Sequence, residues 1–176
     1  MMPTASELLR RVDGRDRALF LRLASGTRDR KRVRLTWTFI THLGGATSSV
    51  VAALAPLFIR ELSAAGSRPL LILILSHAAV QMVKRTIGRP RPSLGVGDFT
   101  SIVEPDRFSF PSGHAAAAMA VAIGYALAFP PLALPLVAIA TVVGISRVCL
   151  GVHYPGDVVM GQSLAIVTAI ALATLT

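Results

Sequence analysis

The amino-acid sequence predicts an all-α protein: a polytopic bundle of about five transmembrane helices, preceded by an amphipathic helix at the membrane interface. Of the 176 residues, 53% are apolar and only 15% are charged, and the mean hydropathy is +0.63. Soluble domains of this length rarely have such a composition. The apolar residues also come in long blocks, which is the pattern of a helical membrane protein. No internal repeat divides them, so residues 1–176 are expected to form one domain.

The first 34 residues form a basic arm with ten Lys or Arg and four acidic residues. Residues 5–24 alternate Leu, Val and Phe with Arg at roughly helical spacing. They are too charged to span a bilayer, so we expect a helix along the interface and a basic flank at 27–34. No apolar core precedes a small-residue cleavage site, which excludes a signal peptide. Nucleic-acid binding is the competing interpretation, but the arm lacks interleaved aromatic residues, so no nucleic-acid partner is expected.

The first predicted span is Leu35–Ile59, which has 25 residues without a charge. At 1.5 Å per residue this is long enough to cross about 30 Å of hydrocarbon. Gly44 and Gly45 in its middle would allow a neighbouring helix to approach closely. A short loop, 60–68, follows.

The second predicted span begins near Pro69 and continues to about Ile87. His77, Gln81 and Lys84 are spaced i, i+4, i+7 and therefore share one helix face. Two interpretations stay open. The first is a polar seam that is satisfied inside the bundle, and the second is a supporting role beside a functional site.

Residues 88–113 are the longest polar stretch after the arm and contain four prolines. A third span opens at His114, where alanines suit close helix packing. Pro130 and Pro131 make a turn, and the fourth span runs from Leu132 to about Ile145. The fifth begins at Pro155 and continues to the end of the sequence.

Between the last two spans, residues 146–157 (SRVCLGVHYPGD) contain a cation, Arg147, an imidazole, His153, and a carboxylate, Asp157. Pro155 suits the first position of a helix, which puts Asp157 in its first turn. From there Asp157 can reach back to one ring nitrogen of His153 and leave the other free to act as a nucleophile. A purely structural His–Asp pair is the alternative. Ionisable groups at the edge of a membrane-length segment are costly, which favours a functional role.

Two further clusters have the same character. Lys84–Pro92 (KRTIGRPRP) ends a span with a cation and holds Arg91 between prolines, which stiffen the backbone. A guanidinium presented in this way suits phosphate oxygens, whereas a simple positive-inside flank would not explain the prolines. In Phe110–His114 (FPSGH), Ser112 is a natural N-cap and Gly113 permits close backbone approach. Such a helix start is an anion site, with His114 beside it.

The predicted topology brings all three clusters to the same face of the membrane. Three cations, a helix N-terminus, two histidines and an aspartate then converge at one depth. Together these groups form a site for a phosphate-like anion that includes a nucleophile and a proton donor. No Cys, His or carboxylate patch has metal-ligand spacing, so we expect a metal-free mechanism and no cofactor.

The three clusters resemble the signature motifs of the type 2 phosphatidic acid phosphatase (PAP2) family, which shares its site with vanadium haloperoxidases and some bacterial acid phosphatases. The residues that carry the resemblance are Lys84–x6–Arg91–Pro92, Pro111–Ser112–Gly113–His114 and Ser146–Arg147–x5–His153–x3–Asp157. All motif positions are present between residues 84 and 157. The N-terminal third has no part in the resemblance, and many members of the family have six spans rather than five.

The resemblance implies a role for each motif residue. His153 would attack phosphorus to form a phosphohistidine, with Asp157 orienting it, and His114 would protonate the leaving oxygen and later activate water. The residues that would bind the phosphoryl oxygens are Lys84, Arg91, Ser112, Gly113 and Arg147. Such binding stabilises the charge that develops during the reaction.

We therefore expect an integral membrane lipid phosphatase that acts on a phosphomonoester or diphosphate. The candidate substrates are phosphatidic acid, phosphatidylglycerol phosphate, polyprenyl diphosphate and polyprenyl-phosphoryl sugar phosphates. A non-catalytic lipid-phosphate binding or transport protein is the alternative, although both motif histidines are intact. A vanadate-dependent peroxidase is a further one, but haloperoxidases are soluble and far longer. The sequence indicates no oligomeric state.

The short chain favours a prokaryotic envelope-lipid enzyme in the cytoplasmic membrane. With five spans, the arm and the three clusters lie on one side. The arm and the loop 85–113 are much richer in Lys and Arg than the opposite loops, which hold only Arg60 and Arg68. The positive-inside rule therefore favours a cytoplasmic active site, although the arginines of the loop have a separate use in phosphate binding.

Overall fold

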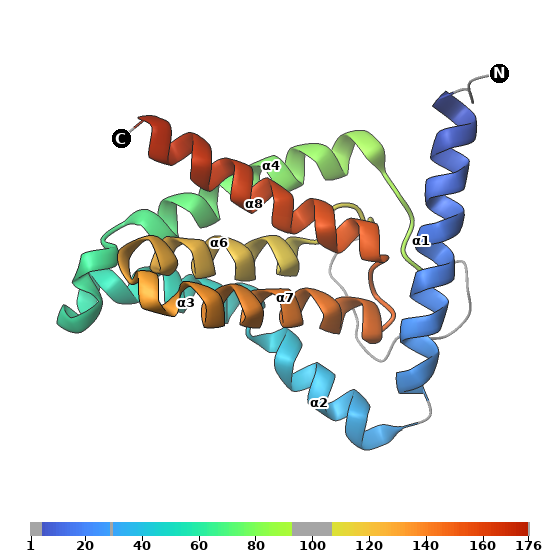
Figure 1. Ribbon diagram of the computed structural model, residues 1–176, viewed down its shortest axis with the longest axis horizontal. Helices are drawn as coiled ribbons and strands as arrows, with labels where there is room; N and C mark the ends of the chain where they lie inside the picture. The colour runs from blue at the N-terminus through green and yellow to red at the C-terminus, as the bar shows by residue number, and fades with distance from the viewer. Residues whose placement is uncertain (1–4, 29, 93–106, 176) are drawn as a thin grey trace.

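The computed structural model describes residues 5–28, 30–92 and 107–175, with side chains from residue 13 onward except at Arg28. The middle of the predicted polar stretch, 93–106, lies outside the described residues. The predicted all-α class is confirmed, because the described elements are all helices (Figure 1). They are α1 (Ala5–Arg28), α2 (Lys31–His42), α3 (Ala46–Phe58), the 3-10 helix η1 (Arg60–Ala65), α4 (Arg68–Ile87), α6 (Gly113–Ala128), the 3-10 helix η2 (Pro130–Leu132), α7 (Ala133–Cys149) and α8 (Pro155–Leu175).

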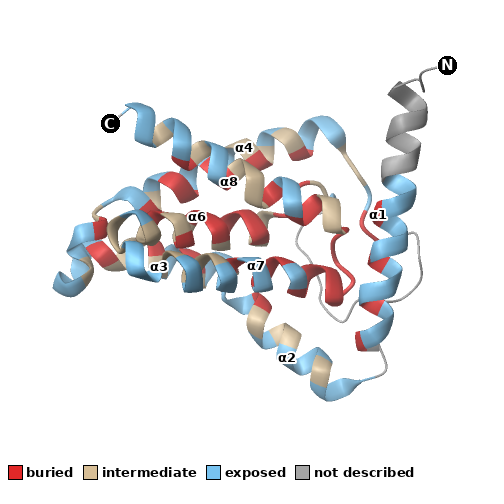
Figure 2. Cartoon of the chain, viewed as in Figure 1, coloured by how far each residue is buried: buried red, intermediate tan, exposed pale blue. Residues whose placement is uncertain are grey.

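Helix α6 is the centre of the bundle and packs against α3, α4, α7 and α8. Its sequence, GHAAAAMAVAIGYALA, explains this place, because small side chains let neighbouring helices approach closely. Ala115, Ala116 and Ala120 are almost completely buried. Figure 2 shows the buried residues concentrated on α6 and at the ends of α7 and α8 that lie near α1.

The five predicted spans correspond to helices, with one important difference. Among the described residues, α4, η2 with α7, and α8 are long and apolar enough to cross a membrane, and α6 is a shorter apolar helix. The first predicted span is not one helix, because α2 and α3 are bent by 41° at Leu43–Gly45. A Cβ at Gly44 would lie 2.6 Å from the Val143 side chain and 2.8 Å from the His114 carbonyl oxygen. The predicted close approach is therefore correct, but the chain also breaks there, as expected where two glycines interrupt a helix.

Other boundaries also differ from the prediction. The expected loop at 60–68 contains η1, and the expected fourth span continues four residues beyond Ile145, to Cys149. The basic flank at 27–34 is largely helical, because α1 extends to Arg28 and α2 begins at Lys31.

Helix α1 is confirmed and lies across the end of the bundle where α7 ends and α8 begins (Figure 1). Part of its apolar face packs against the protein rather than facing outward. Phe20 and Ala24 are buried in a cluster with residues of α7 and the α7–α8 turn, including Val148 and Tyr154. Thr27 adds a hydrogen bond from its hydroxyl to the Cys149 carbonyl, at 2.6 Å. The arm is therefore packed against the bundle at the end that carries the three motifs.

Candidate active site

The turn between α7 and α8 holds His153 and Asp157, which are 1% and 0% exposed. Helix α8 begins at Pro155 with Asp157 in its first turn, as predicted. The Asp157 Oδ2 atom accepts a hydrogen bond from the Tyr154 amide at 2.8 Å and lies 3.6 Å from His153 Nδ1. The carboxylate therefore faces Nδ1, at a distance longer than a direct hydrogen bond.

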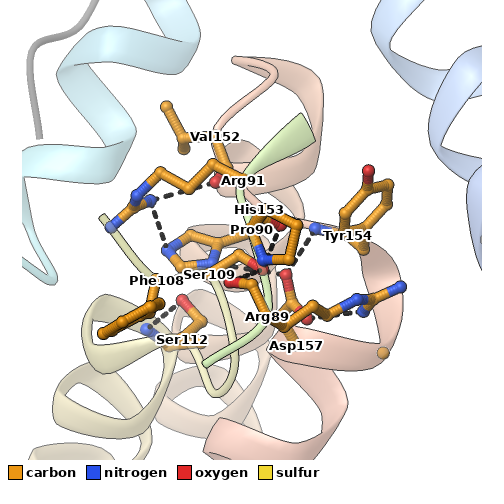
Figure 3. Close-up of polar contacts among 12 residues, drawn as sticks. Arg89, Pro90, Arg91, Phe108, Ser109, Ser112, Val152, His153, Tyr154 and Asp157 are labelled. Carbon is orange, nitrogen blue, oxygen red and sulfur yellow. Dashed lines mark hydrogen bonds and ion pairs between the residues drawn. The ribbon is translucent and has the colours of Figure 1, made fainter. Parts of the chain in front are cut away.

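The opposite ring nitrogen, Nε2 of His153, points to Arg91 (Figure 3). The Arg91 Nη1 atom lies 3.3 Å from Nε2 and donates a hydrogen bond to the Val152 carbonyl at 3.0 Å. The carboxylate therefore lies beside Nδ1, and the Arg91 cation lies beside Nε2. This arrangement suits a ring that attacks an anionic group with Nε2.

The segment that carries Arg91 is held by contacts with Phe108 and Ser109, which lie just before α6. Pro90 forms an isolated antiparallel bridge with Phe108, and the Ser109 amide donates to the Arg89 carbonyl at 2.8 Å. The Lys84 ammonium lies 3.4 Å from the Phe108 carbonyl oxygen. These contacts add to the stiffness that the prolines predict.

Ser112 is the N-cap of α6, as predicted, and its hydroxyl oxygen accepts from the Ala115 amide at 3.4 Å. The Ser112 amide donates to the Asp157 carbonyl at 2.9 Å, which joins the start of α6 to the start of α8. The two helices touch here because Gly161 has no side chain. A Cβ at Gly161 would overlap with the Ser112 carbonyl oxygen.

Arg147 lies in the last turn of α7 and is completely buried. It was expected just beyond the helix, but the helix continues to Cys149. Its Nη1 atom donates to the hydroxyl of Thr41 on α2 at 2.8 Å. Thr41 is therefore a supporting residue that sequence reasoning missed, because 106 positions separate the two.

A cavity of about 600 Å³ opens between α3, α4 and α6. Five of the eight predicted site residues line it, while Ser112, Arg147 and Asp157 are buried and do not. The five that line it are Lys84, Arg91, Gly113, His114 and His153. The remaining wall is largely apolar and includes Val50 and Ile74, which are 45% and 54% exposed on the outside of the bundle.

His77 and Gln81 also line this cavity, about two turns and one turn before Lys84 on the same face of α4. Their Nε2 atoms are 3.2 Å apart and hydrogen-bonded. His77 is exposed, Gln81 is half-buried and Lys84 is buried, so the interpretation as a seam inside the bundle does not hold for His77. Their position favours the second interpretation, a role beside the site.

Sequence reasoning also missed Arg89 and the acids that surround it. Its guanidinium donates to Asp157 Oδ1 at 2.7 Å, to Asp16 Oδ2 at 2.8 Å and to Asp13 Oδ1 at 2.6 Å. Burial alone would lower the pKa of Arg89, but the three carboxylates outweigh burial and raise the pKa above its ordinary value. The sequence shows Asp13 and Asp16 three residues apart in a mostly basic helix, but this spacing does not identify Arg89 as their partner.

The chain that carries this site matches the model of a known protein family. The model of the PAP2 superfamily matches residues 65–176, a segment that contains all three motifs. The chain belongs to the PAP2 superfamily. The resemblance stated from the motifs is thereby confirmed, and the fold of this PAP2 protein supports it. A solved structure of the transmembrane PAP2-type phosphatidylglycerolphosphate phosphatase from Bacillus subtilis matches with a TM-score of 0.72 and 28% identity, over 93% of this chain and 85% of the other.

Two curated relatives act on different lipids. A lipid A 1-phosphatase from Rhizobium etli is 36% identical over 57% of this PAP2 chain and 47% of the relative. A decaprenylphosphoryl-5-phosphoribose phosphatase from Mycolicibacterium smegmatis is 41% identical over 49% of this chain and 47% of the relative. This PAP2 chain thus spans about half the length of these two relatives.

Proposed function

We propose that the protein is an integral membrane lipid phosphatase that works through a phosphohistidine. The observation that carries the proposal is the orientation of His153, with Nδ1 towards the Asp157 carboxylate and Nε2 towards Arg91 at the cavity wall. A nucleophile with an orienting carboxylate behind it and a cation before it is the arrangement that covalent phosphoryl transfer requires.

In the first step, His153 Nε2 forms a bond to phosphorus while the bond from phosphorus to the lipid oxygen breaks. The electron pair leaves with that oxygen, and His114 donates a proton to it. In the second step, water attacks the phosphohistidine, His114 accepts the water proton, and the phosphorus–nitrogen bond breaks to release phosphate. Lys84, Arg91 and Arg147 stabilise the charge on the phosphoryl oxygens, which is commonly the largest catalytic contribution.

The substrate class is a lipid with a terminal phosphate. The cavity that reaches His153 has an apolar wall on the outer side of the bundle, which suits a lipid chain, and cations at its inner end, which suit a phosphate. The relatives act on lipid A, a decaprenylphosphoryl sugar phosphate and phosphatidylglycerol phosphate. The head groups to test are phosphatidic acid, phosphatidylglycerol phosphate, polyprenyl diphosphate and a polyprenyl-phosphoryl sugar phosphate.

The purified protein is expected to release inorganic phosphate from at least one of these lipids in detergent, with excess chelator present. Vanadate is expected to inhibit, because it adopts the five-coordinate geometry of the transition state. The measurement is phosphate release for each head group, with and without chelator and vanadate. Binding of the lipid without phosphate release would favour the non-catalytic alternative, and a requirement for magnesium would contradict the proposed mechanism.

We also propose that the protein resides in a prokaryotic cytoplasmic membrane with the active site on the cytoplasmic face. The basic arm and the motif loops lie at the same end of the bundle, and this end carries the excess of Lys and Arg (Figure 1). The excess supports a cytoplasmic orientation for that end.

Cysteine labelling tests this orientation. In a Cys149→Ser background, Ser25→Cys places an exposed thiol on α1, and Ser63→Cys places one on η1 at the other end of the bundle. An impermeant thiol reagent applied to intact cells is expected to label the second variant only. Labelling of the first variant alone would reverse the orientation.

A further inference from the structure

Arg89 and Arg91 flank Pro90, and their guanidinium groups reach different parts of the site (Figure 3). Pro90 between them forms the bridge to Phe108, and the Ser109 amide donates to the Arg89 carbonyl. Arg91 reaches the Nε2 side of His153, whereas Arg89 reaches Asp157. The two arginines therefore bracket the His153–Asp157 pair from its two ends.

Asp157 requires such a neighbour because its side chain is completely buried. A buried carboxylate is costly unless cations and hydrogen-bond donors compensate for the lost water. Its Oδ2 atom accepts from the Tyr154 amide, and its Oδ1 atom accepts from Arg89. With both contacts made, the position of Oδ2 opposite His153 Nδ1 is determined.

Arg89 is itself held by α1. Asp16, which is almost completely buried, pairs with the same Nη1 atom that contacts Asp157. The other Asp16 oxygen accepts from the Gly156 amide at 2.7 Å, in the first turn of α8. The Arg89 guanidinium also lies 4.1 Å from the centre of the Tyr154 ring, against which Phe20 packs edge-on at 5.4 Å.

Asp13 completes the group from a different environment. It pairs with Nη2 of Arg89 at 2.6 Å, but its side chain is 64% exposed. Ion pairs of this kind contribute little, because water screens them. Asp13 and Asp16 thus bind the same guanidinium, but only Asp16 is buried and also accepts from the Gly156 amide, so the two acids can be compared by experiment.

We propose that Arg89 is a positioning residue for the His153–Asp157 pair and that Asp16 acts through it, so that the N-terminal helix is a working part of the active site. The inference rests on the proposed phosphatase function. Helix α1 lies outside the segment that matches the PAP2 family model, so the three family motifs do not include Asp16.

The test is a double-mutant cycle in purified protein. Arg89→Gln is expected to lower kcat by about 10²-fold, as a misplaced reacting group does, with KM unchanged. Asp16→Asn keeps an acceptor for the Gly156 amide and is expected to lower kcat by about tenfold. The double variant should be no slower than Arg89→Gln alone. Arg89→Lys should recover part of the loss. The controls, Asp13→Asn and Arg85→Gln, change exposed residues in α1 and in the last turn of α4 and should leave kcat unchanged.

Rapid-quench measurement of phosphoenzyme formation should show the same losses, because the proposal concerns the attack by His153. An unchanged kcat in Arg89→Gln, or a rise in KM alone, would contradict the inference. Additive effects of Arg89→Gln and Asp16→Asn would contradict the action of Asp16 through Arg89. If Arg89→Gln does not fold, the inference is tested by comparing kcat of Asp16→Asn with kcat of Asp13→Asn. Equal values would contradict it.

Absence of phosphate release by the unaltered protein would instead contradict the proposed function. In that case the Kd for vanadate is measured for each variant of the cycle in place of kcat. Vanadate binding requires an oriented His153 but no turnover. Equal affinity across the cycle would contradict the inference in that case.

Discussion

Replacing His153 with alanine is expected to lower kcat by at least about 10⁴-fold and to remove the covalent phosphoenzyme. The reason is that Nε2 of this residue is the atom aimed at the cavity, with Asp157 behind the ring and Arg91 in front. Rapid acid quenching with a substrate labelled at phosphorus measures the covalent species directly. Asp157→Asn should also abolish turnover, because the orienting charge is lost.

His77 provides the control, since it is a third histidine in the wall of the same cavity, besides His114 and His153. His77→Ala should retain phosphoenzyme formation. His114→Ala should slow both formation and breakdown of the phosphoenzyme, because His114 handles the proton in each step. Label recovered on His153→Ala protein would disprove the assignment of the nucleophile.

A methyl group at Gly161 is the second change with a large expected effect. Gly161→Ala would push the added carbon into the Ser112 carbonyl oxygen, so α8 must move away from the start of α6. Overpacking of this kind typically costs 1–3 kcal/mol of stability. The shift would also strain the hydrogen bond from the Ser112 amide to the Asp157 carbonyl, so kcat should fall by about 10²-fold. The measurements are the thermal midpoint in detergent and phosphate release.

Gly26→Ala is the matched control, because it makes the same substitution within a helix where an added Cβ meets nothing within 4 Å. Alanine has the higher helix propensity, so this variant should be as stable as the unaltered protein or slightly more stable. Equal behaviour of the two variants would show that contact between α6 and α8 does not position Asp157.

Much of this arrangement could be predicted from the sequence, because it depends on local signals. Pro155 at a helix start, Ser112 as an N-cap and charges at the ends of apolar blocks fix where each motif lies along its helix. The alternation of spans then brings the motifs to one end of the bundle. The break at Gly44 was missed because an uncharged stretch of 25 residues looks the same whether or not it bends.

The supporting contacts could not be predicted in this way. Thr41 reaches Arg147 across 106 positions, and Asp16 reaches Arg89 across 73. No periodicity or cap signals such tertiary pairs. The prediction for the arm depended on its net charge, which gives the acids no separate role. In the folded protein Asp16 of α1 is buried, whereas basic residues such as Arg15 and Arg22 are exposed.

The cavity wall formed by Val50 and Ile74 has a consequence for how the reaction should be measured. These side chains are exposed on the outside of the bundle. With the proposed function, a lipid substrate is expected to enter the cavity from the side of the bundle, with its phosphate directed toward Lys84. The concentration that governs the rate is then the mole fraction of lipid phosphate within the membrane plane. Adding inert detergent at constant total substrate should therefore slow turnover by surface dilution.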